Sequence, residues 1–269
     1  MDVSIIIVNY NGLEVLQSCL PSLKRLRSTT EFEIILVDNA SGDGSVEFAR
    51  NEFSDIHVIV NESNAGFGHA SNTGAQIARG RYLFFLNPDT IVHEDFLTPL
   101  VSFLEERSDV GIVCPKVINE DGSLQLSCGK LTTFVREAVD KIVYSLARRK
   151  IALVQEWLER KYTVPTEVEW VSGAALMIRA AVFQSLAGFD TNIFMYFEDK
   201  DLCKRARGQG WKVFFYPYVS LMHHLGSSSK GSDPVRQRRI YRASQLYYYK
   251  KHHGRIQQTL LTVYQKISH

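Results

Sequence analysis

Asp89 stands where a carboxylate could bind a metal ion. It follows the apolar run 82–86 and a turn containing Pro88, which fixes its own φ and donates no amide hydrogen, so we expect a buried strand to end here. In open α/β sheets, ligands bind at the carboxyl ends of the strands. A carboxylate at that edge can hold a divalent cation and, through it, a diphosphate. The alternative for Asp89 is a cap of the following helix.

A second acidic cluster consists of Glu198, Asp199 and Asp201, beside aromatic residues. A carboxylate near an apolar wall can have a raised pKa and act as a base, although these acids would also suit the N-terminus of a helix. His223 ends a further apolar stretch, where it is either structural or a metal ligand that shares an ion with Asp89.

Alternating strands and helices would bring these residues together. Apolar runs predict strands at 3–8, 33–37, 56–60 and 82–86, and helical spacing predicts helices at 13–26, 45–53, 69–78 and 96–105. This alternation predicts βαβ units and an α/β fold whose mainly parallel sheet carries helices on both faces. Further strands are expected at 111–115, 169–178 and 213–216. Within 169–178, Gly173 lies in a small-residue turn that lets another group approach the backbone closely.

Three polar turns directly follow the predicted strands and would lie along one sheet edge. They hold Asn9 with Tyr10, then Asp38, then Asn87 with Asp89. Tyr10 could stack on a base and Asp38 could accept a hydrogen bond from a pyrimidine imide; the alternatives are a rim aromatic and a turn-stabilising side chain. The first turn lacks the Gly-x-Gly-x-x-Gly pattern of dinucleotide folds, and the sequence contains no Walker A loop.

The composition is that of an ordinary globular protein, with 45% hydrophobic and 22% charged residues. No apolar run approaches the roughly 20 residues of a membrane span. Strand-like residues begin at Val3 without a basic leader, so we expect a cytoplasmic protein with no signal peptide. The four scattered cysteines are expected to be reduced thiols and not zinc ligands.

The charge is unevenly distributed along the chain. Residues 227–269 hold nine Lys or Arg and one Asp, a net charge of +8, whereas residues 1–226 carry −6. Such a basic, Tyr-rich helical extension suits an anionic partner. We expect residues 236–255 to contact an anionic membrane peripherally, at the inner face of the cell membrane; a solvated helix face is the alternative.

Six motifs, in order over about residues 3–254, carry a family resemblance. They are Val37-Asp38-Asn39-Ala40-Ser41-x-Asp43-Gly44-Ser45, Asn64-x-Gly66-Phe67-Gly68-x-Ala70-x-Asn72-x-Gly74, Leu86-Asn87-Pro88-Asp89-Thr90, Gly188-Phe189-Asp190, Phe197-Glu198-Asp199-x-Asp201-Leu202-Cys203-x-Arg205 and His223-x-x-Gly226. With them the chain resembles the family 2 glycosyltransferases of GT-A fold, especially the bacterial rhamnosyltransferase-like branch.

The resemblance implies a GT-A domain with a Rossmann-like sheet over residues 1–226. Its nucleotide-sugar-binding half would be 1–115 and its acceptor half 116–226, followed by the helical extension 227–269. Asp199 would be the catalytic base, and Asp89 and His223 would bind Mg²⁺ or Mn²⁺. The nucleotide-sugar would be bound by Asn9, Tyr10, Asp38, Asn64 and Asn87, and Glu198, Asp201 and Gly173 would contact the acceptor or support the site. Asn87 stands where the family's Asp-x-Asp motif has its first acid, which puts the tightness of metal binding in question.

The implied reaction is an inverting displacement that moves a sugar from a nucleotide-sugar to a glycan in cell-surface polysaccharide synthesis. The leading donor is dTDP-L-rhamnose, and the leading acceptor is a glycan linked to polyprenyl diphosphate; no nucleic acid partner is expected. A UDP-hexose-dependent transferase and a non-catalytic nucleotide- or glycan-binding protein are the alternatives. A sugar-nucleotide pyrophosphorylase would need a Gly-rich basic loop after the first strand, where this chain has Asn9-Tyr10-Asn11-Gly12.

Overall fold

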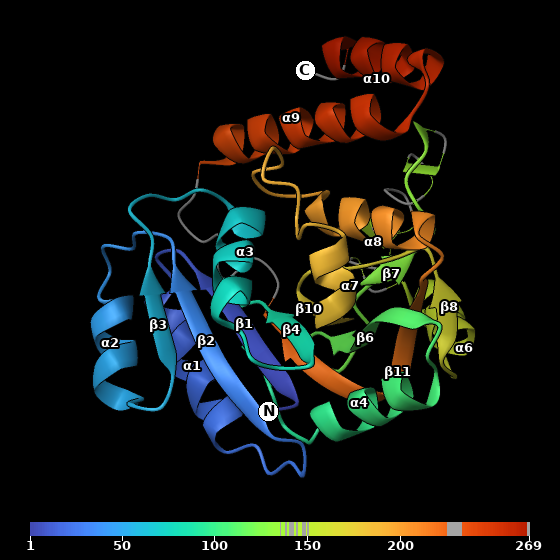
Figure 1. Cartoon of the computed structure of the whole chain (residues 1–269). Coiled ribbons are helices and arrows are strands. Elements are labelled where there is room, and N and C mark those ends of the chain that lie inside the picture. The colour runs from blue at the N-terminus through green and yellow to red at the C-terminus, as the bar shows by residue number, and fades with distance from the viewer. Residues whose placement is uncertain are drawn as a thin grey trace.

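The protein folds around one mixed sheet with helices on both faces, and a helical hairpin at the C-terminal end of the chain lies across one end of it (Figure 1). The structure is a computed structural model that describes residues 1–134, 136–137, 139, 143, 145–146, 149, 151–224 and 233–267. Gly226, the last residue of the sixth motif and of the predicted domain, lies outside the described residues, so that domain boundary stays a prediction.

The first half alternates strands and helices as predicted. Its elements are β1 (Val3–Asn9), α1 (Leu13–Lys24), β2 (Phe32–Asp38), α2 (Ser45–Glu52), β3 (His57–Val60), α3 (Phe67–Ile77), β4 (Tyr82–Leu86), β5 (Thr90–Ile91) and α4 (Leu97–Glu106). β1 pairs in parallel with both β2 and β4, and β2 pairs in parallel with β3. The carboxyl ends of these strands therefore meet at one edge.

The second half completes the sheet and adds the hairpin. Its elements are β6 (Val110–Ile118), β7 (Cys128–Gly129), α6 (Ala152–Lys161), β8 (Thr166–Val168), β9 (Trp170–Val171), β10 (Ala175–Arg179), α7 (Ala180–Ser185), α8 (Glu198–Gly208), β11 (Lys212–His223), α9 (Pro234–His252) and α10 (Arg255–Ile267). The sheet order is β3-β2-β1-β4-β10-β6-β11-β5, with β8 paired to β11. β10 is antiparallel to both of its neighbours, so the sheet is mainly, not wholly, parallel.

Two expected strands differ from the structure. The stretch 169–178 is not one strand: β9 and β10 are separated by a turn at Gly173, and they belong to different sheets. β11 continues beyond the expected end at Tyr216 to His223. A register shift between Tyr216 and Ser220 absorbs Pro217, which cannot donate to a ladder.

Two apolar layers hold the helices on the sheet. Successive residues of a strand point to opposite faces, so Ile5 and Ile7 join the layer under α1 and α4, whereas Ile6 joins the layer with residues of α3, α7 and α8. Burial of each such side chain contributes roughly 1.5–3 kcal/mol. The four cysteines are free and buried, as expected for reduced thiols. Over the described ranges, no helix is long and apolar enough to cross a membrane.

Candidate active site

A cavity of about 490 Å³ opens at the carboxyl ends of β1 and β4, and the starts of α8 and α9 also line it. Eight of the eleven predicted site residues line it: Tyr10, Asn64, Asn87, Asp89, Gly173, Glu198, Asp199 and His223. The fold thus brings together residues that are up to 213 positions apart, from Tyr10 to His223.

Asp89 and His223 meet because β5 pairs with the end of β11. The register places His223 opposite Thr90, directly after Asp89. His223 Nε2 lies 3.0 Å from Asp89 Oδ1 and 3.3 Å from Asn87 Nδ2. Both members of the Asp89–His223 pair are largely buried, with 1% and 12% of their side chains exposed.

Gln125 fixes the orientation of the His223 ring. Its Oε1 lies 2.9 Å from His223 Nδ1, and its Nε2 donates to the His223 carbonyl at 2.7 Å. In the tautomer that donates from Nδ1, Nε2 is an acceptor that faces the Asp89 carboxylate. A hydrogen bond of this kind behind a histidine is the usual support of a metal ligand.

The Asp89–His223 pair fits a divalent cation that substrate oxygens would complete. Two ligands at right angles around Mg²⁺ or Mn²⁺ lie about 3 Å apart, which matches the Oδ1–Nε2 distance of 3.0 Å. A cation between two acceptors also satisfies both of them. Within the described part of the chain, no three His, Cys, Asp or Glu side chains form a group that could hold a metal. The pair by itself supplies two ligands, so a divalent cation here would take its remaining ligands from substrate oxygens or water.

Asp199 is presented by a strained turn at the N-terminus of α8. Tyr196 and Phe197 adopt φ of 69° and 68°, which costs about 1–3 kcal/mol each for residues other than glycine. Asp199 Oδ2 accepts from the Gly173 amide at 3.1 Å, and Oδ1 accepts from the Lys200 amide at 2.7 Å. A Cβ at Gly173 would lie 3.3 Å from the Phe67 ring, which is a tight contact, and 3.8 Å from Asp199 Cβ, which is an ordinary one, so glycine lets these groups approach closely.

Glu198, which is buried, and Asp199, which is half-buried, are neighbouring carboxylates whose charges interact. Burial raises the pKa of Asp199, although the Lys200 charge and the Gly173 amide act in the opposite direction. Burial, with the charge of Asp199, also raises the pKa of Glu198. The buried Glu198 Oε2 makes no hydrogen bond with the described residues. The pair therefore favours one retained proton, and the two amides stabilise Asp199 as the anion.

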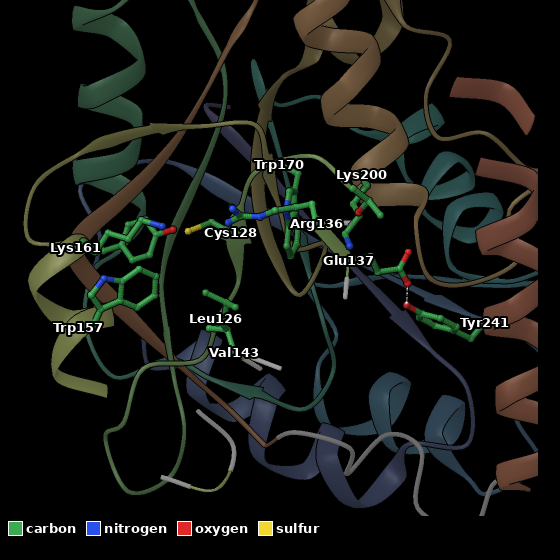
Figure 2. A pocket seen from close by; sticks show the side chains of 13 residues that line it. Leu126, Cys128, Arg136, Glu137, Val143, Trp157, Lys161, Trp170, Lys200 and Tyr241 are labelled. Carbon is green, nitrogen blue, oxygen red and sulfur yellow. Dashed lines mark hydrogen bonds between the residues drawn. The ribbon is translucent and has the colours of Figure 1, made fainter. Parts of the chain in front are cut away.

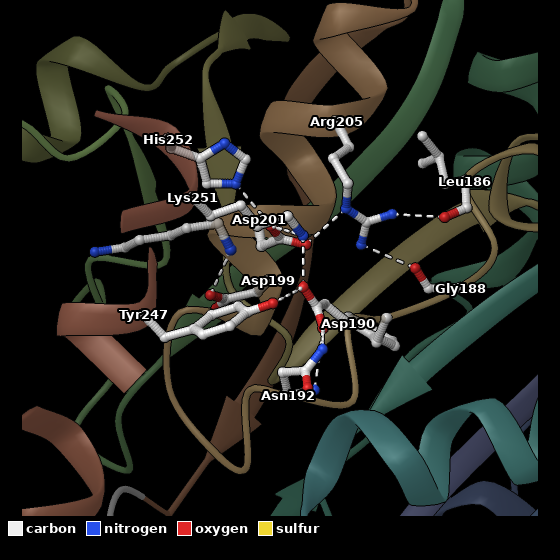
Figure 3. A network of polar contacts seen from close by, with 12 residues as sticks. Leu186, Gly188, Asp190, Asn192, Asp199, Asp201, Arg205, Tyr247, Lys251 and His252 are labelled. Carbon is white, nitrogen blue, oxygen red and sulfur yellow. Dashed lines mark hydrogen bonds and ion pairs between the residues drawn. The ribbon is translucent and has the colours of Figure 1, made fainter. Parts of the chain in front are cut away.

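Asp201 does not line the cavity. Its side chain contacts Lys251 and His252 of α9 instead (Figure 3). Its fully buried carboxylate accepts from Arg205 Nε at 2.6 Å, from Lys251 Nζ at 2.7 Å and from His252 Nε2 at 2.6 Å. Lys251 also contacts Asp190 Oδ2 at 2.6 Å. Burial alone would raise the pKa of Asp201, but the His252 hydrogen bond and the neighbouring cations hold it below the ordinary value. This geometry gives Asp201 a structural contact with the C-terminal hairpin.

Asn9 and Asp38 are both buried beneath the cavity and do not line it. Asn9 Nδ2 donates to Asp38 Oδ2 at 2.8 Å, and Asp38 also accepts from the Ser41 amide and hydroxyl, each at 2.7 Å. The two side chains thus hold the first two polar turns together. A base contact by Asp38 stays a prediction.

The glycine-rich second motif allows close packing of the backbone and places Asn64 at the cavity. Gly66 has φ of 88°, and a Cβ there would come within 2.1 Å of the Phe194 carbonyl oxygen. Asn64 Oδ1 accepts from the Gly66 amide at 3.1 Å. Farther along the motif, Asn72 exchanges two hydrogen bonds of 2.9 Å with the backbone of Phe189. The second and fourth motifs are therefore joined by direct contacts.

Sequence reasoning missed the contribution of α9. Its residues Arg236, Gln237 and Ile240, with the N-cap Asp233, line the cavity opposite Asp89 and Asp199. The Asp233-Pro234 pair, an N-cap followed by proline at the first helical position, could have predicted a helix that starts eleven residues after His223. Gln125 was also missed, because nothing local in the sequence connects it with His223.

A second cavity has a volume of about 300 Å³ and is lined in part by Trp170 and Lys200 (Figure 2). The two cavities lie on either side of the same segments, since Gly173 and Asp199 line the first, and Trp170 and Lys200 the second. Lys200 Nζ lies 4.6 Å from the centroid of the Trp170 ring. The opposite wall carries a matching pair of Trp157 and Lys161, 4.9 Å apart. The lining thus combines aromatic faces and cations with the carboxylate of Glu137.

Comparison of the sequence with family models gives the family of this chain. A model described as glycosyl transferase family 2 matches residues 4–151, and one described as glycosyl transferase family group 2 matches residues 82–265. The chain belongs to glycosyl transferase family 2 and is a glycosyltransferase.

The individual relatives share less than a third of their aligned residues with this chain. The N-acetylglucosaminyl-diphospho-decaprenol L-rhamnosyltransferase of Mycobacterium tuberculosis is 28% identical over 247 residues, which cover 86% of this chain and 78% of the relative. Rhamnosyltransferase WbbL of Escherichia coli is 25% identical over 59% of this chain and 61% of its own length. A crystal structure of GalNAc-T7 with UDP, GalNAc and Mn²⁺ superposes with a TM-score of 0.65 at 20% identity, over 93% of this chain and 50% of that one. This likeness confirms the predicted GT-A fold.

Proposed function

We propose that this glycosyltransferase moves L-rhamnose from dTDP-L-rhamnose to a glycan carried on polyprenyl diphosphate, with inversion at the anomeric carbon. The observation that carries the proposal is that the Asp89–His223 pair and Asp199, the proposed base, line the same cavity. The choice of sugar and acceptor is supported by the Mycobacterium relative, an L-rhamnosyltransferase named for a lipid-diphosphate acceptor, and by the E. coli rhamnosyltransferase.

The donor would occupy the end of the cavity formed by the first half of the chain. Tyr10, 42% exposed at the rim, would stack on the base, and Asn64 and Asn87 would donate to the ribose or diphosphate. Asp89 and His223 would hold Mg²⁺ or Mn²⁺. The bound cation would supply electrostatic stabilisation of the negative charge that develops on the departing nucleoside diphosphate.

The acceptor would occupy the side of Asp199. A sugar hydroxyl is a weak nucleophile, so Asp199 would take its proton as the oxygen attacks the anomeric carbon. Direct displacement requires no covalent enzyme intermediate and inverts the configuration. The second cavity would bind the part of the acceptor glycan that lies beyond the reacting hydroxyl, because its lining residues Trp170 and Lys200 lie close in sequence to Gly173 and Asp199 of the first cavity. The donor end of the cavity would correspond to the proposed nucleotide-sugar-binding half, 1–115, and the acceptor end to the proposed acceptor half, 116–226. We propose that the reaction takes place at the cytoplasmic side of the membrane.

A thermal-shift series tests the donor. A ligand that binds only the native state increases the free energy of unfolding, by about 2.7 kcal/mol at one hundred times its dissociation constant, and therefore raises the midpoint temperature. We expect the largest rise with dTDP or dTDP-rhamnose in the presence of Mn²⁺ or Mg²⁺, and loss of the metal-dependent part in Asp89→Asn. The surface variant Asp109→Asn, which removes only an exposed pair with Lys212, is the matched control.

The other outcomes of this series each revise the proposal. A shift with UDP-hexoses alone would replace the rhamnosyltransferase with a UDP-hexose-dependent transferase of the same family. No shift with any nucleotide would overturn the donor site at Asp89, and the non-catalytic binding protein would take its place.

A further inference from the structure

The last helix, α10, is oriented opposite to the usual surface helix. It lies beyond α9, on the side away from the sheet (Figure 1). The side that faces the protein is largely polar: Gln265 Nε2 donates to Gln245 Oε1 at 2.7 Å and to the Arg242 carbonyl at 3.3 Å, and Gln257 Oε1 accepts from the Phe134 amide at 3.3 Å. The apolar contacts of this side are Leu261, 1% exposed, and one edge of the Tyr264 ring, whose centroid lies 6.1 Å from that of Phe134. A helix on a globular protein normally turns its apolar stripe inward.

The apolar stripe of α10 faces outward. Ile256, Leu260, Val263 and Tyr264 are 79%, 46%, 50% and 43% exposed. Their spacing of four, three and one residues places them on one face of a helix. Water contact with such a stripe costs free energy in proportion to its apolar area, so its position at the outermost edge of the fold indicates an apolar environment there.

Cations lie along one flank of this stripe. Arg255 and Lys266 are exposed and share a row of the helix, since eleven residues make about three turns. On α9, the exposed residues Arg236, Arg238 and Arg239 add to the positive charge of the hairpin. Over the described residues 233–267 there are eight Lys or Arg and one Asp, a net charge of +7. An apolar stripe beside a cationic row fits a surface that is apolar inside and anionic outside.

We propose that α10 lies in the plane of an anionic phospholipid bilayer, with Ile256, Leu260, Val263 and Tyr264 in the interface and Arg255 and Lys266 at the lipid phosphates. A second copy of the chain fits less well. Four side chains are far fewer than the 20–30 residues a side of a stable interface, and the hairpins of two copies would repel each other through their net positive charge.

The membrane-contacting surface proposed on α10 differs from the one expected from the sequence, which was residues 236–255 and included Tyr247, Tyr248 and Tyr249. Tyr248 and Tyr249 are fully buried with Phe197 in an apolar cluster under α10, and Tyr247 donates to Asp190 Oδ2 at 3.1 Å. The buried rings of Tyr248 and Tyr249 cannot insert into a membrane, and the Tyr247 hydroxyl is already bound to Asp190. The expectation of a membrane contact therefore moves from the tyrosines of α9 to the aliphatic face of α10.

The inference rests on the proposed function in one respect, namely that a polyprenyl-linked acceptor resides in a bilayer. α9 connects the two sites, because Arg236 and Ile240 line the reaction cavity while the same helix carries α10 on its other side. Membrane docking of α10 would hold the opening near α9 close to the lipid surface. This places the acceptor diphosphate near the cavity without any movement of the catalytic half.

Co-sedimentation with vesicles tests the docking surface. We expect the full chain to bind vesicles of phosphatidylcholine mixed with phosphatidylglycerol, more weakly as salt rises, and to bind pure phosphatidylcholine poorly. The double variant Ile256→Gln/Leu260→Gln should bind the anionic vesicles at least about tenfold more weakly, since each side chain loses much of its transfer free energy. Ile77→Gln, 46% exposed at the end of α3, is the matched control and should leave binding unchanged.

Three results would overturn the inference. They are no binding to anionic vesicles, binding that the double variant leaves intact, and a wild-type dimer in light scattering that the double variant converts to a monomer, which would assign the stripe to a second copy. The assay contains no donor, and the nucleotide-induced thermal shift is measured separately. Failure of docking is therefore distinguishable from failure of the proposed donor or reaction.

Discussion

The contact between Asp201 and the C-terminal hairpin allows a quantitative prediction. Asp201→Asn keeps the shape of the side chain and removes a carboxylate that is fully buried between three donors at 2.6–2.7 Å. Removal of one partner of a buried ion pair costs about 3–5 kcal/mol, because the other charge stays buried. Lys251 keeps its contact with Asp190, and the amide oxygen still accepts one hydrogen bond, so we expect the lower end, about 3 kcal/mol.

The assay is reversible thermal or urea unfolding at neutral pH. A loss of about 3 kcal/mol corresponds to a fall in Tm of about 6–12 °C for a chain of this size. Asp109→Asn is the control, because the Asp109–Lys212 pair has a similar distance, 2.7 Å, but is half exposed, and its loss should leave Tm nearly unchanged. A Tm for Asp201→Asn equal to that of the control would refute the anchoring role.

The pH dependence of this stabilisation has a defined sign. The folded-state pKa of Asp201 lies below the ordinary 3.8, as does that of Asp190, where burial opposes and the Lys251 contact lowers the value. The native state therefore binds fewer protons than the unfolded chain near that pH. The stability contributed by both groups is fully present above the ordinary pKa and is lost as pH falls through the lowered folded-state values. The difference in unfolding free energy between wild type and Asp201→Asn should shrink in the same acidic range.

Three further predictions concern the site. Gly66→Ala should destabilise the fold by at least about 3 kcal/mol in urea unfolding, because the new Cβ meets the Phe194 carbonyl at 2.1 Å, whereas Gly42→Ala, with nothing within 4 Å, should be tolerated. Gln125→Leu should raise the Mn²⁺ concentration for half-maximal activity by about 10–100-fold, since His223 loses its orienting partner; an unchanged metal titration would contradict this. The kcat/KM of transfer should rise with pH through a midpoint above the ordinary pKa of aspartate, because burial raises the pKa of Asp199. A pH profile that is flat from pH 4 upward would count against this assignment.

The first half of the fold was predictable because each element carries its own signal. The buried strands β1, β2 and β4 are continuous apolar runs, and the polar turns after them fall at their ends. Parallel pairing of β1 with β2 places Asn9 beside Asp38, because both residues end their strands. The two side chains are hydrogen-bonded in the structure. Local pattern and sheet topology agree here, so sequence reasoning reached the correct arrangement.

The second half depends on contacts that no local pattern records. The antiparallel insertion of β10 between β4 and β6 reverses one strand direction, and apolar content does not encode direction. Asp201 belongs to the same acidic run as Asp199, yet helix periodicity turns it toward α9 and leaves Asp199 at the cavity. The orientation of α10 was also hidden, because a helical pattern states which face is apolar but not which face the protein covers.

The most direct test of the central claim is the transfer rate of Asp199→Asn, measured with the donor that gives the largest thermal shift. If Asp199 is the base, the variant should keep the nucleotide-induced shift and lose transfer by about 10²–10⁴-fold, whereas Glu198→Gln should lose less. If Asp199→Asn keeps more than a tenth of the rate while Glu198→Gln abolishes it, the assignment of the base, and with it the orientation of the acceptor in the cavity, is wrong.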